Sequence, residues 1–197
     1  MKFALDVITP RPWKNGGGTT REIAAWPPGA DMDAFDWRIS VADITEDGPF
    51  SAFPGIDRQI VLIDGAGVHL HAHDDSFHHK LIHVGEPFAF PGDTAVDATL
   101  VDGPTRDFNV MTRRGVCRAE VRLMRQPFTV DPTDATVLVL ALRGHWDCGD
   151  GHHMAAGDGM LMAAGAPAVT LVHKGIAALC LRVTLHKLHK TAKESVR

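Results

Sequence analysis

The sequence lacks tyrosine altogether and has only three cysteines among its 197 residues. The cysteines are far apart and odd in number, so they form neither a disulfide framework nor a CxxC motif, and a reducing cytoplasm is the expected compartment. No apolar run approaches the ~20 residues that a membrane helix needs. The apolar run at the N-terminus is interrupted by Asp6, which argues against a signal peptide. We therefore expect a cytoplasmic protein with no membrane partner.

Positive charge is also scarce, because 20 Lys and Arg face 24 Asp and Glu, for a formal net charge of -4. Without a basic stripe in the body of the chain, nucleic acid is not an expected partner. The basic tail, residues 191–197, is expected to be a solvated terminus. A hydrophobic content of 45% with 22% charged residues is ordinary for a globular protein with a real core.

No stretch has the periodicity of a long amphipathic helix, whereas alternation typical of strands is frequent. Residues 37–43 and 179–185 alternate strictly between two faces. Residues 58–63 and 136–142 are short, nearly unbroken apolar runs, as expected for strands covered on both faces. Turn clusters rich in Gly and Pro separate these segments, so the sequence predicts an all-β protein, either a sandwich or a barrel.

A weak internal repeat suggests two lobes. Residues 60–67 and 138–145 both run an apolar strand into a glycine turn, and a Gly-Asp turn follows each of them, at residues 91–94 and 156–159. The second copy is shorter than the first. We therefore expect two related lobes. The expected division is an N-terminal segment with a larger lobe (1–125), a shortened second lobe (126–190) and the basic tail (191–197).

Three consecutive glycines, Gly16 to Gly18, call for positive φ or a close backbone approach. They do not form a phosphate loop of known pattern, because no Gly-Lys follows and the GxGxxG spacing is absent. One interpretation is a tight loop whose free N–H groups bind a small anion, with help from Lys14, Asn15 and Arg21. The other is a structural turn that joins two strands.

A histidine stripe follows one predicted strand. His69, His71 and His73 alternate, so they project from one face, and His78 comes soon afterwards. This resembles the first half of the cupin metal signature, but TAVDA stands where its last histidine belongs. We therefore expect no metal cofactor on this stripe. The alternative is a metal site formed by His69, His71, His73 and His78, since neutral imidazole suits Zn, Ni or Fe.

Four blocks together resemble the HutD/Ves family, in the same order and with similar spacing. They are WKNGGGTTREI, WRISVADITEDGPFSAFPGIDRQIVLIDG, PFAFPGD and GPTRDFNVMTRR, which cover residues 13 to about 114. The stretch from TVLVLALRG to LRVTL matches the weaker C-terminal half. The resemblance implies a bicupin, with two small antiparallel β-barrels of jelly-roll type in one chain. The family is associated with bacterial histidine-utilisation operons. The resemblance therefore implies a regulator that limits the activity of the pathway by sensing one of its intermediates. Because Ves relatives are found outside such operons, the resemblance does not by itself link this chain to histidine utilisation.

With this resemblance, the candidate residues form one ligand-binding set, and none of them is expected to be catalytic. Arginine grips a carboxylate with two hydrogen bonds, and Asn can pair with an amide or formyl oxygen. The expected ligand is therefore a small anionic metabolite such as formylglutamate or urocanate. For single residues, structural roles remain open: Arg58 could pair with Asp57 or Asp107, and Asn109 could satisfy a turn. The predicted binding residues are Lys14, Asn15, Gly16, Gly17, Arg21, Arg38, Ser40, Arg58 and Asn109.

Three functions stay open at this stage. We expect a non-enzymatic regulator of histidine utilisation that binds a small metabolite. The first alternative is a metal-dependent cupin enzyme that uses the histidine stripe. The second is an interaction protein whose lobes are filled with side chains. The sequence also leaves a homodimer open.

Overall fold

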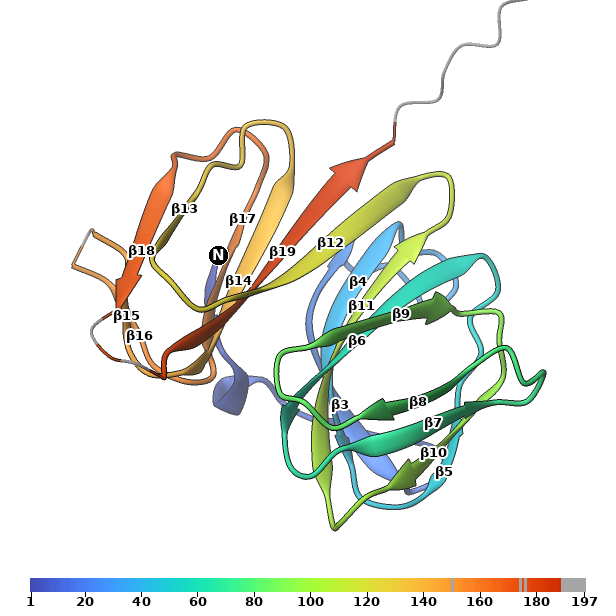
Figure 1. Ribbon diagram of the computed structural model, residues 1–197. Coiled ribbons are helices and arrows are strands. Elements are labelled where there is room, and N and C mark those ends of the chain that lie inside the picture. The colour runs from blue at the N-terminus through green and yellow to red at the C-terminus, as the bar shows by residue number, and fades with distance from the viewer. Residues whose placement is uncertain (150, 174, 176, 189–197) are drawn as a thin grey trace, which may run out of the picture.

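The structure, a computed structural model, describes residues 1–149, 151–173, 175 and 177–188. It consists almost entirely of strands, and every strand pairing among these residues is antiparallel (Figure 1). In the described part of the chain, the one helix is the 3-10 turn η1 (Leu5–Val7), so none could serve as a membrane span. The all-β prediction is confirmed.

The N-terminal half consists of two sheets. The larger has six strands in the order β2 (Arg11–Pro12), β3 (Gly18–Trp26), β4 (Trp37–Ile44), β11 (Thr105–Arg113), β6 (Ile56–Asp64), β9 (Pro87–Pro91). The smaller has four strands in the order β5 (Gly48–Phe50), β10 (Val96–Leu100), β7 (Val68–Ala72), β8 (His78–Leu81). Apolar side chains from both sheets, including Ile60, Leu62, Leu70 and Val96, form one core cluster between them. This half, the N-terminal sandwich, holds most of the predicted binding residues.

The C-terminal half repeats the arrangement. Its larger sheet has five strands in the order β1 (Lys2–Ala4), β17 (Asp158–Met162), β14 (Thr136–Arg143), β19 (Leu179–Lys187), β12 (Cys117–Met124). Its smaller sheet has four strands in the order β13 (Phe128–Val130), β18 (Val169–His173), β15 (Trp146–Asp147), β16 (His153–Met154). The fully buried Trp146 lies in the cluster that fills the space between these two sheets.

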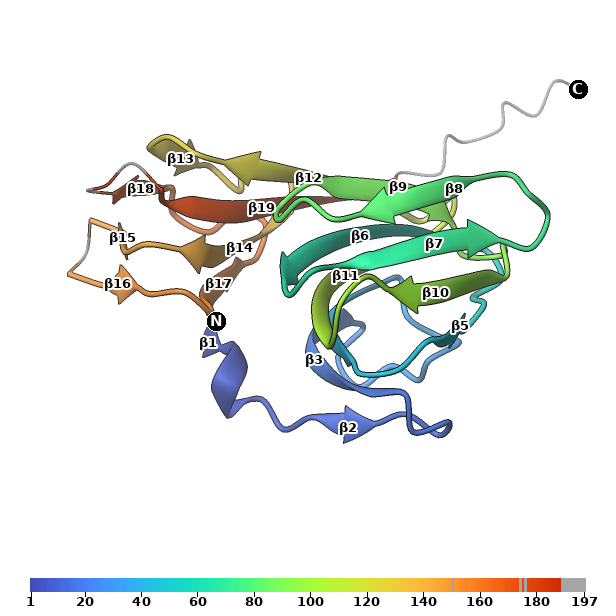
Figure 2. The same cartoon turned by 60° about the horizontal axis from the view of Figure 1, so that its bottom comes forward.

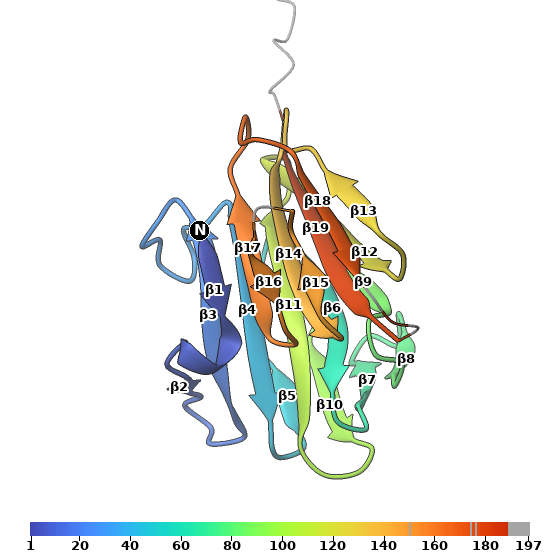
Figure 3. The same ribbon diagram turned by 90° about the vertical axis from the view of Figure 1, so that its left-hand side faces the viewer.

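The two larger sheets pack against each other, so the molecule has four layers with the small sheets outermost (Figures 1 and 2). Ile39, Val41 and Phe108 from the six-stranded sheet share one core cluster with Leu138 and Val183 from the five-stranded sheet. Figure 3 looks along this stack from the side of the C-terminal small sheet. The expected closed barrels are wrong. Among the described residues, each half consists of two stacked open sheets, and the edge strands of one sheet do not pair with those of the other.

Strand pairing also differs from the expected grouping of residues 1–125. β1 pairs with β17, with Lys2 opposite Met160, so the chain begins in the sheet of the C-terminal half. β12 pairs with β19 in the same sheet. Phe3 needs a glycine on the neighbouring strand, because a Cβ on Gly159 would lie 2.3 Å from its ring. The predicted basic tail, residues 191–197, lies outside the described residues.

Candidate functional site

A polar cluster lies on the inner face of the six-stranded sheet, within the N-terminal sandwich. Strand alternation turns Ile39 and Val41 toward the C-terminal half and leaves the side chains between them facing the sandwich interior. Register then sets the rows across the sheet: Asn109 is opposite Ser40, and two residues further along β11, Met111 is opposite both Arg38 and Arg58. The structure thus brings together four of the predicted binding residues: Arg38, Ser40, Arg58 and Asn109.

Arg58 is buried in an aromatic cage with an incomplete set of hydrogen bonds. The rings of Phe50, Phe53 and Phe90 lie 5.5, 5.6 and 5.0 Å from its guanidinium carbon. One terminal nitrogen donates to the Asn109 side-chain oxygen (2.8 Å), and the other donates to the Ser51 carbonyl (3.3 Å). Its Nε has no partner in the described structure. Burial, with the nearby Arg38 charge, lowers the pKa of Arg58 to about 10.

Asp107 is the residue that the sequence analysis did not place in the site. It lies two residues before Asn109 on the same face of β11, and it is fully buried. Neither of its carboxylate oxygens has a hydrogen-bond partner among the described residues. Burial raises its pKa to about 7, against an opposing effect from the positive charge of Arg58. The D-x-N spacing within one strand was the signal that could have identified it.

Neither of the anticipated structural partners, Asp57 and Asp107, forms a hydrogen bond with Arg58, although the charge of Asp107 favours the protonated form and acts to raise the pKa of Arg58. Asp57 instead pairs with Arg114 at 2.8 Å. Within the described residues, no carboxylate oxygen is recorded within 4.0 Å of the Arg58 guanidinium. Arg38 differs in this respect, because its Nε donates to Glu22 at 2.8 Å and a terminal nitrogen donates to the Ser40 hydroxyl at 3.3 Å. A buried guanidinium with an incomplete set of hydrogen bonds, near a buried carboxylate that has none, is costly unless a third group bridges them.

The glycine loop is separate from this cluster. Gly18 pairs with Ile44, six residues from Arg38 along β4, which is about 20 Å of strand. The loop N–H groups are also occupied, since that of Gly16 donates to the Trp13 carbonyl (3.1 Å) and that of Gly17 donates to the Asn15 side chain (3.2 Å). The structural-turn interpretation therefore fits better than an anion-binding loop, and the glycines connect β2 to β3.

Arg21 and Lys14 do not join the cluster either. Arg21 is opposite Val41, on the other face of the sheet from Arg38, and its guanidinium is paired with Asp43. Asp43 also accepts a hydrogen bond from Arg106 at 2.6 Å. Lys14 is exposed in the loop. Arg21 thus stabilises the other face of the sheet, and neither residue faces the interior.

Gly18 should be far less tolerant of substitution than its neighbour Gly17. A Cβ on Gly18 would lie 2.3 Å from the Asp43 carbonyl oxygen, whereas a Cβ on Gly17 meets nothing closer than 3.7 Å. Gly18→Ala is expected to reduce the free energy of unfolding by about 1–3 kcal/mol, as overpacking does. Gly17→Ala is the matched control and should change it by less than about 0.5 kcal/mol. Urea denaturation measures both, and equal effects would contradict this account of the loop.

The histidine stripe faces outward. Along β7 the side chains of Val68, Leu70 and Ala72 are buried, so His69 and His71 between them are exposed. The predicted alternation is correct, but the stripe has the wrong orientation for a metal centre inside the sandwich. His73 Nε2 lies 2.9 Å from a carboxylate oxygen of Asp97. Of the four histidines in the alternative metal site, only His71 and His78 stack on each other, with ring centroids 4.1 Å apart.

Comparison with known proteins extends the resemblance seen in the motifs. The family model described as HutD matches residues 6–181. The chain belongs to the HutD family. Protein Ves of Escherichia fergusonii is 43% identical over 139 residues, which are 70% of this chain and 70% of that relative. A structure of HutD from Pseudomonas fluorescens (formate condition) has a TM-score of 0.82 at 31% identity, with 96% of this chain and 99% of that chain covered. The family predicted from the motifs is confirmed.

More distant structures share the fold alone. A cupin 2 conserved barrel domain protein from Leptotrichia buccalis has a TM-score of 0.59 at 12% identity, with 93% of this chain and 95% of that chain covered. This HutD-family chain is thus a cupin-like all-β protein.

Proposed function

We propose that this HutD-family protein is a non-enzymatic receptor for a small anionic metabolite and that it regulates histidine utilisation. The observation that carries the proposal is the pair of incompletely satisfied buried ions in the N-terminal sandwich. Arg58 Nε and both oxygens of Asp107 lack a partner among the described residues. Unsatisfied buried charges are rare in native proteins, and they cluster where a ligand completes the network.

The two charges define the ligand's chemistry. Arg58 offers a donor to a carboxylate, and Asp107 accepts from an N–H group or, when protonated, donates to an oxygen. Asn109 lies between them along β11, and because its oxygen already accepts from Arg58, its NH₂ group is oriented to donate to a ligand oxygen. Formylglutamate has carboxylates, an amide N–H and a formyl oxygen. Urocanate has a carboxylate and an imidazole N–H.

Access to Arg58 is proposed to run past Phe53. A hollow of about 420 Å³ lies at this end of the sandwich, bordered by Phe53, Ile56, Met32 and Arg113. Phe53 borders both this hollow and the guanidinium of Arg58. We propose that rotation of this ring connects the hollow to the buried charge. We further propose that the two halves are a pair of cupin modules, one of which has kept this polar interior.

The enzyme alternative has weaker support. The outward face of β7 supplies no ligand set to the sandwich interior, where a cupin enzyme would hold its metal and substrate. The interaction-protein alternative would require a filled interior with no role for the unpartnered groups of Arg58 and Asp107.

A thermal-shift screen tests the proposal with formylglutamate, urocanate and succinate. Succinate is the matched control because it has carboxylates without an N–H group. A ligand at 100 times its Kd adds about 2.7 kcal/mol of stability, which corresponds to roughly 5–10 °C in a chain of this size. We expect such a shift with formylglutamate or urocanate and a smaller one with succinate. No shift with either pathway intermediate, or equal shifts with all three compounds, would contradict the proposal.

A further inference from the structure

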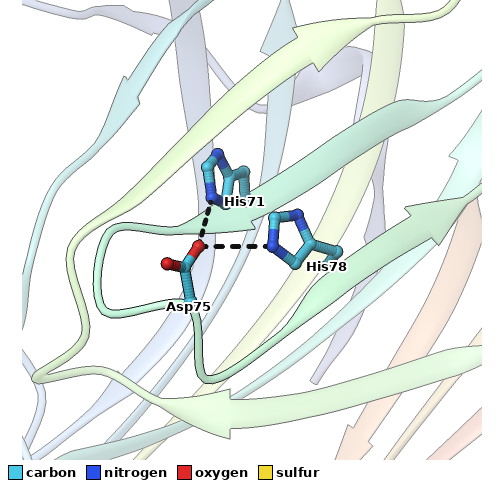
Figure 4. Close-up of side chains that lie close together, drawn as sticks. All are labelled: His71, Asp75 and His78. Carbon is cyan, nitrogen blue, oxygen red and sulfur yellow. Dashed lines mark hydrogen bonds and ion pairs between the residues drawn. The ribbon is translucent and has the colours of Figure 1, made fainter.

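A second group of convergent side chains lies on the outer surface of the N-terminal small sheet. His71 on β7 and His78 on β8 are directly opposite in the antiparallel register. The hairpin between them places Asp75 against both rings, as Figure 4 shows. All three residues are exposed, by 52%, 80% and 63% for His71, Asp75 and His78. They are thus accessible to solvent ions and separate from the buried Arg58 cluster.

The distances between the donor atoms suit a metal ion. Asp75 Oδ1 lies 3.1 Å from His71 Nε2 and 3.4 Å from His78 Nε2, and all three donor atoms lie within 4.8 Å of one another. Ligands about 2.1 Å from a zinc ion lie roughly 3.0 Å apart at octahedral angles and 3.4 Å apart at tetrahedral angles. The two distances from Asp75 Oδ1 to the imidazole nitrogens therefore already match the spacing of ligands around a zinc ion.

The backbone holds this geometry. Asp75 is the one residue other than glycine with positive φ (56°) in the described part of the chain. Its N–H donates to the Ala72 carbonyl at 3.0 Å, which closes the turn. The carboxylate is thereby held on the same side as both imidazoles. The histidine pair is fixed independently, because β7 and β8 form a regular ladder from Val68 to His71.

We propose that His71, Asp75 and His78 form a surface site for a borderline divalent cation such as Zn²⁺. Two imidazoles and a carboxylate are ligands that such ions favour, and the exposed side leaves the remaining coordination positions to water. This proposal goes against the expectation from the sequence that the stripe holds no metal. It also differs from the alternative site of His69, His71, His73 and His78, because it replaces two of those histidines with Asp75. Because all three ligands are exposed, we expect the bound ion to exchange with solvent.

Nearby histidines provide matched controls. His69 lies on the same exposed face of β7, but it is opposite Lys80, whose positive charge opposes a cation there. His73 is engaged with Asp97 at 2.9 Å. Asp75→Asn removes the ligand charge while keeping a residue type that tolerates positive φ. His78→Ala removes one imidazole from the exposed surface.

The test is titration of the tag-free full-length protein with Zn²⁺, followed by calorimetry and metal analysis after dialysis. We expect one saturable equivalent, weakened at least tenfold by His78→Ala and by Asp75→Asn and unchanged by His69→Ala. Circular dichroism melts of each variant in the absence of metal establish that the fold is retained. Absence of saturable binding would overturn the proposal. So would wild-type affinity in Asp75→Asn, or an equal loss in His69→Ala, because either would indicate general binding to a histidine-rich surface.

Discussion

Replacing Arg58 with alanine should weaken binding of the responsive metabolite ten- to hundredfold. The guanidinium is the one cation of the buried cluster that has no carboxylate partner among the described residues, so it is the anchor available to a ligand carboxylate. Charge-assisted hydrogen bonds of this type contribute about 1.5–3 kcal/mol. A loss of this size weakens binding roughly ten- to hundredfold. Calorimetric titration with formylglutamate and urocanate measures the loss.

Two controls separate this effect from packing and from general charge. Arg58→Met keeps much of the side-chain volume within the cage of Phe50, Phe53 and Phe90, so it should show the same loss of affinity with a smaller loss of stability. Arg21→Ala removes an arginine on the opposite face of the sheet, paired with Asp43, and it should leave affinity within about twofold. If Arg21→Ala weakens binding as much as Arg58→Ala does, the glycine-loop end of the sheet is the site instead.

Replacing Asp107 with asparagine should stabilise the protein above pH 7 and have no such effect near pH 4. Burial raises the pKa of Asp107 from 3.8 to about 7 in the folded protein. Between these values the folded state holds a proton that the unfolded state has released, so raising the pH favours unfolding. The cost develops from about pH 4, is complete above about pH 7 and amounts to roughly 4 kcal/mol. Asparagine cannot ionise, so the Asp107→Asn variant does not lose this free energy of unfolding as the pH rises.

The measurement is the free energy of unfolding of wild type and Asp107→Asn between pH 4 and pH 8.5. The other titratable groups are common to both proteins, so the difference between the two curves isolates the contribution of Asp107. We expect that difference to grow in favour of the variant as the pH rises and to level off above about pH 7. A difference independent of pH would mean that Asp107 is already ionised in the folded protein.

The sequence predicted the strands well because their alternation is set locally. Trp37 to Asp43 alternate as expected, and the side of the sheet that holds Arg38 and Ser40 is the interior one. The sheet edges were not predictable in this way. Whether β1 joins β17 or the N-terminal half depends on pairing between residues about 158 positions apart, such as Lys2 and Met160, and no local pattern encodes that choice. The closed barrels were expected from the resemblance rather than from a local pattern, and the structure has open sheets in their place.

The candidate site was predicted in part. Arg38, Ser40, Arg58 and Asn109 do converge, since each lies at an interior position of a central strand. Asp107 was considered only as a partner for Arg58, although the same alternation that selected Asn109 places it on the same face. The sequence left two interpretations of the glycine loop open, because a run of glycines has the same sequence whether it binds a ligand or forms a tight connection. The structure distinguishes the two through Gly18, which passes close to the Asp43 carbonyl.

The most direct test of the binding proposal is a crystal structure of the protein soaked with the metabolite that gives the largest thermal shift. The account predicts a ligand carboxylate within hydrogen-bond distance of Arg58 Nε, with a ligand N–H or oxygen at the Asp107 carboxyl and the Phe53 ring displaced. Ligand density at residues 14–18 or in the C-terminal half, with the Arg58 and Asp107 side chains unchanged, would contradict it.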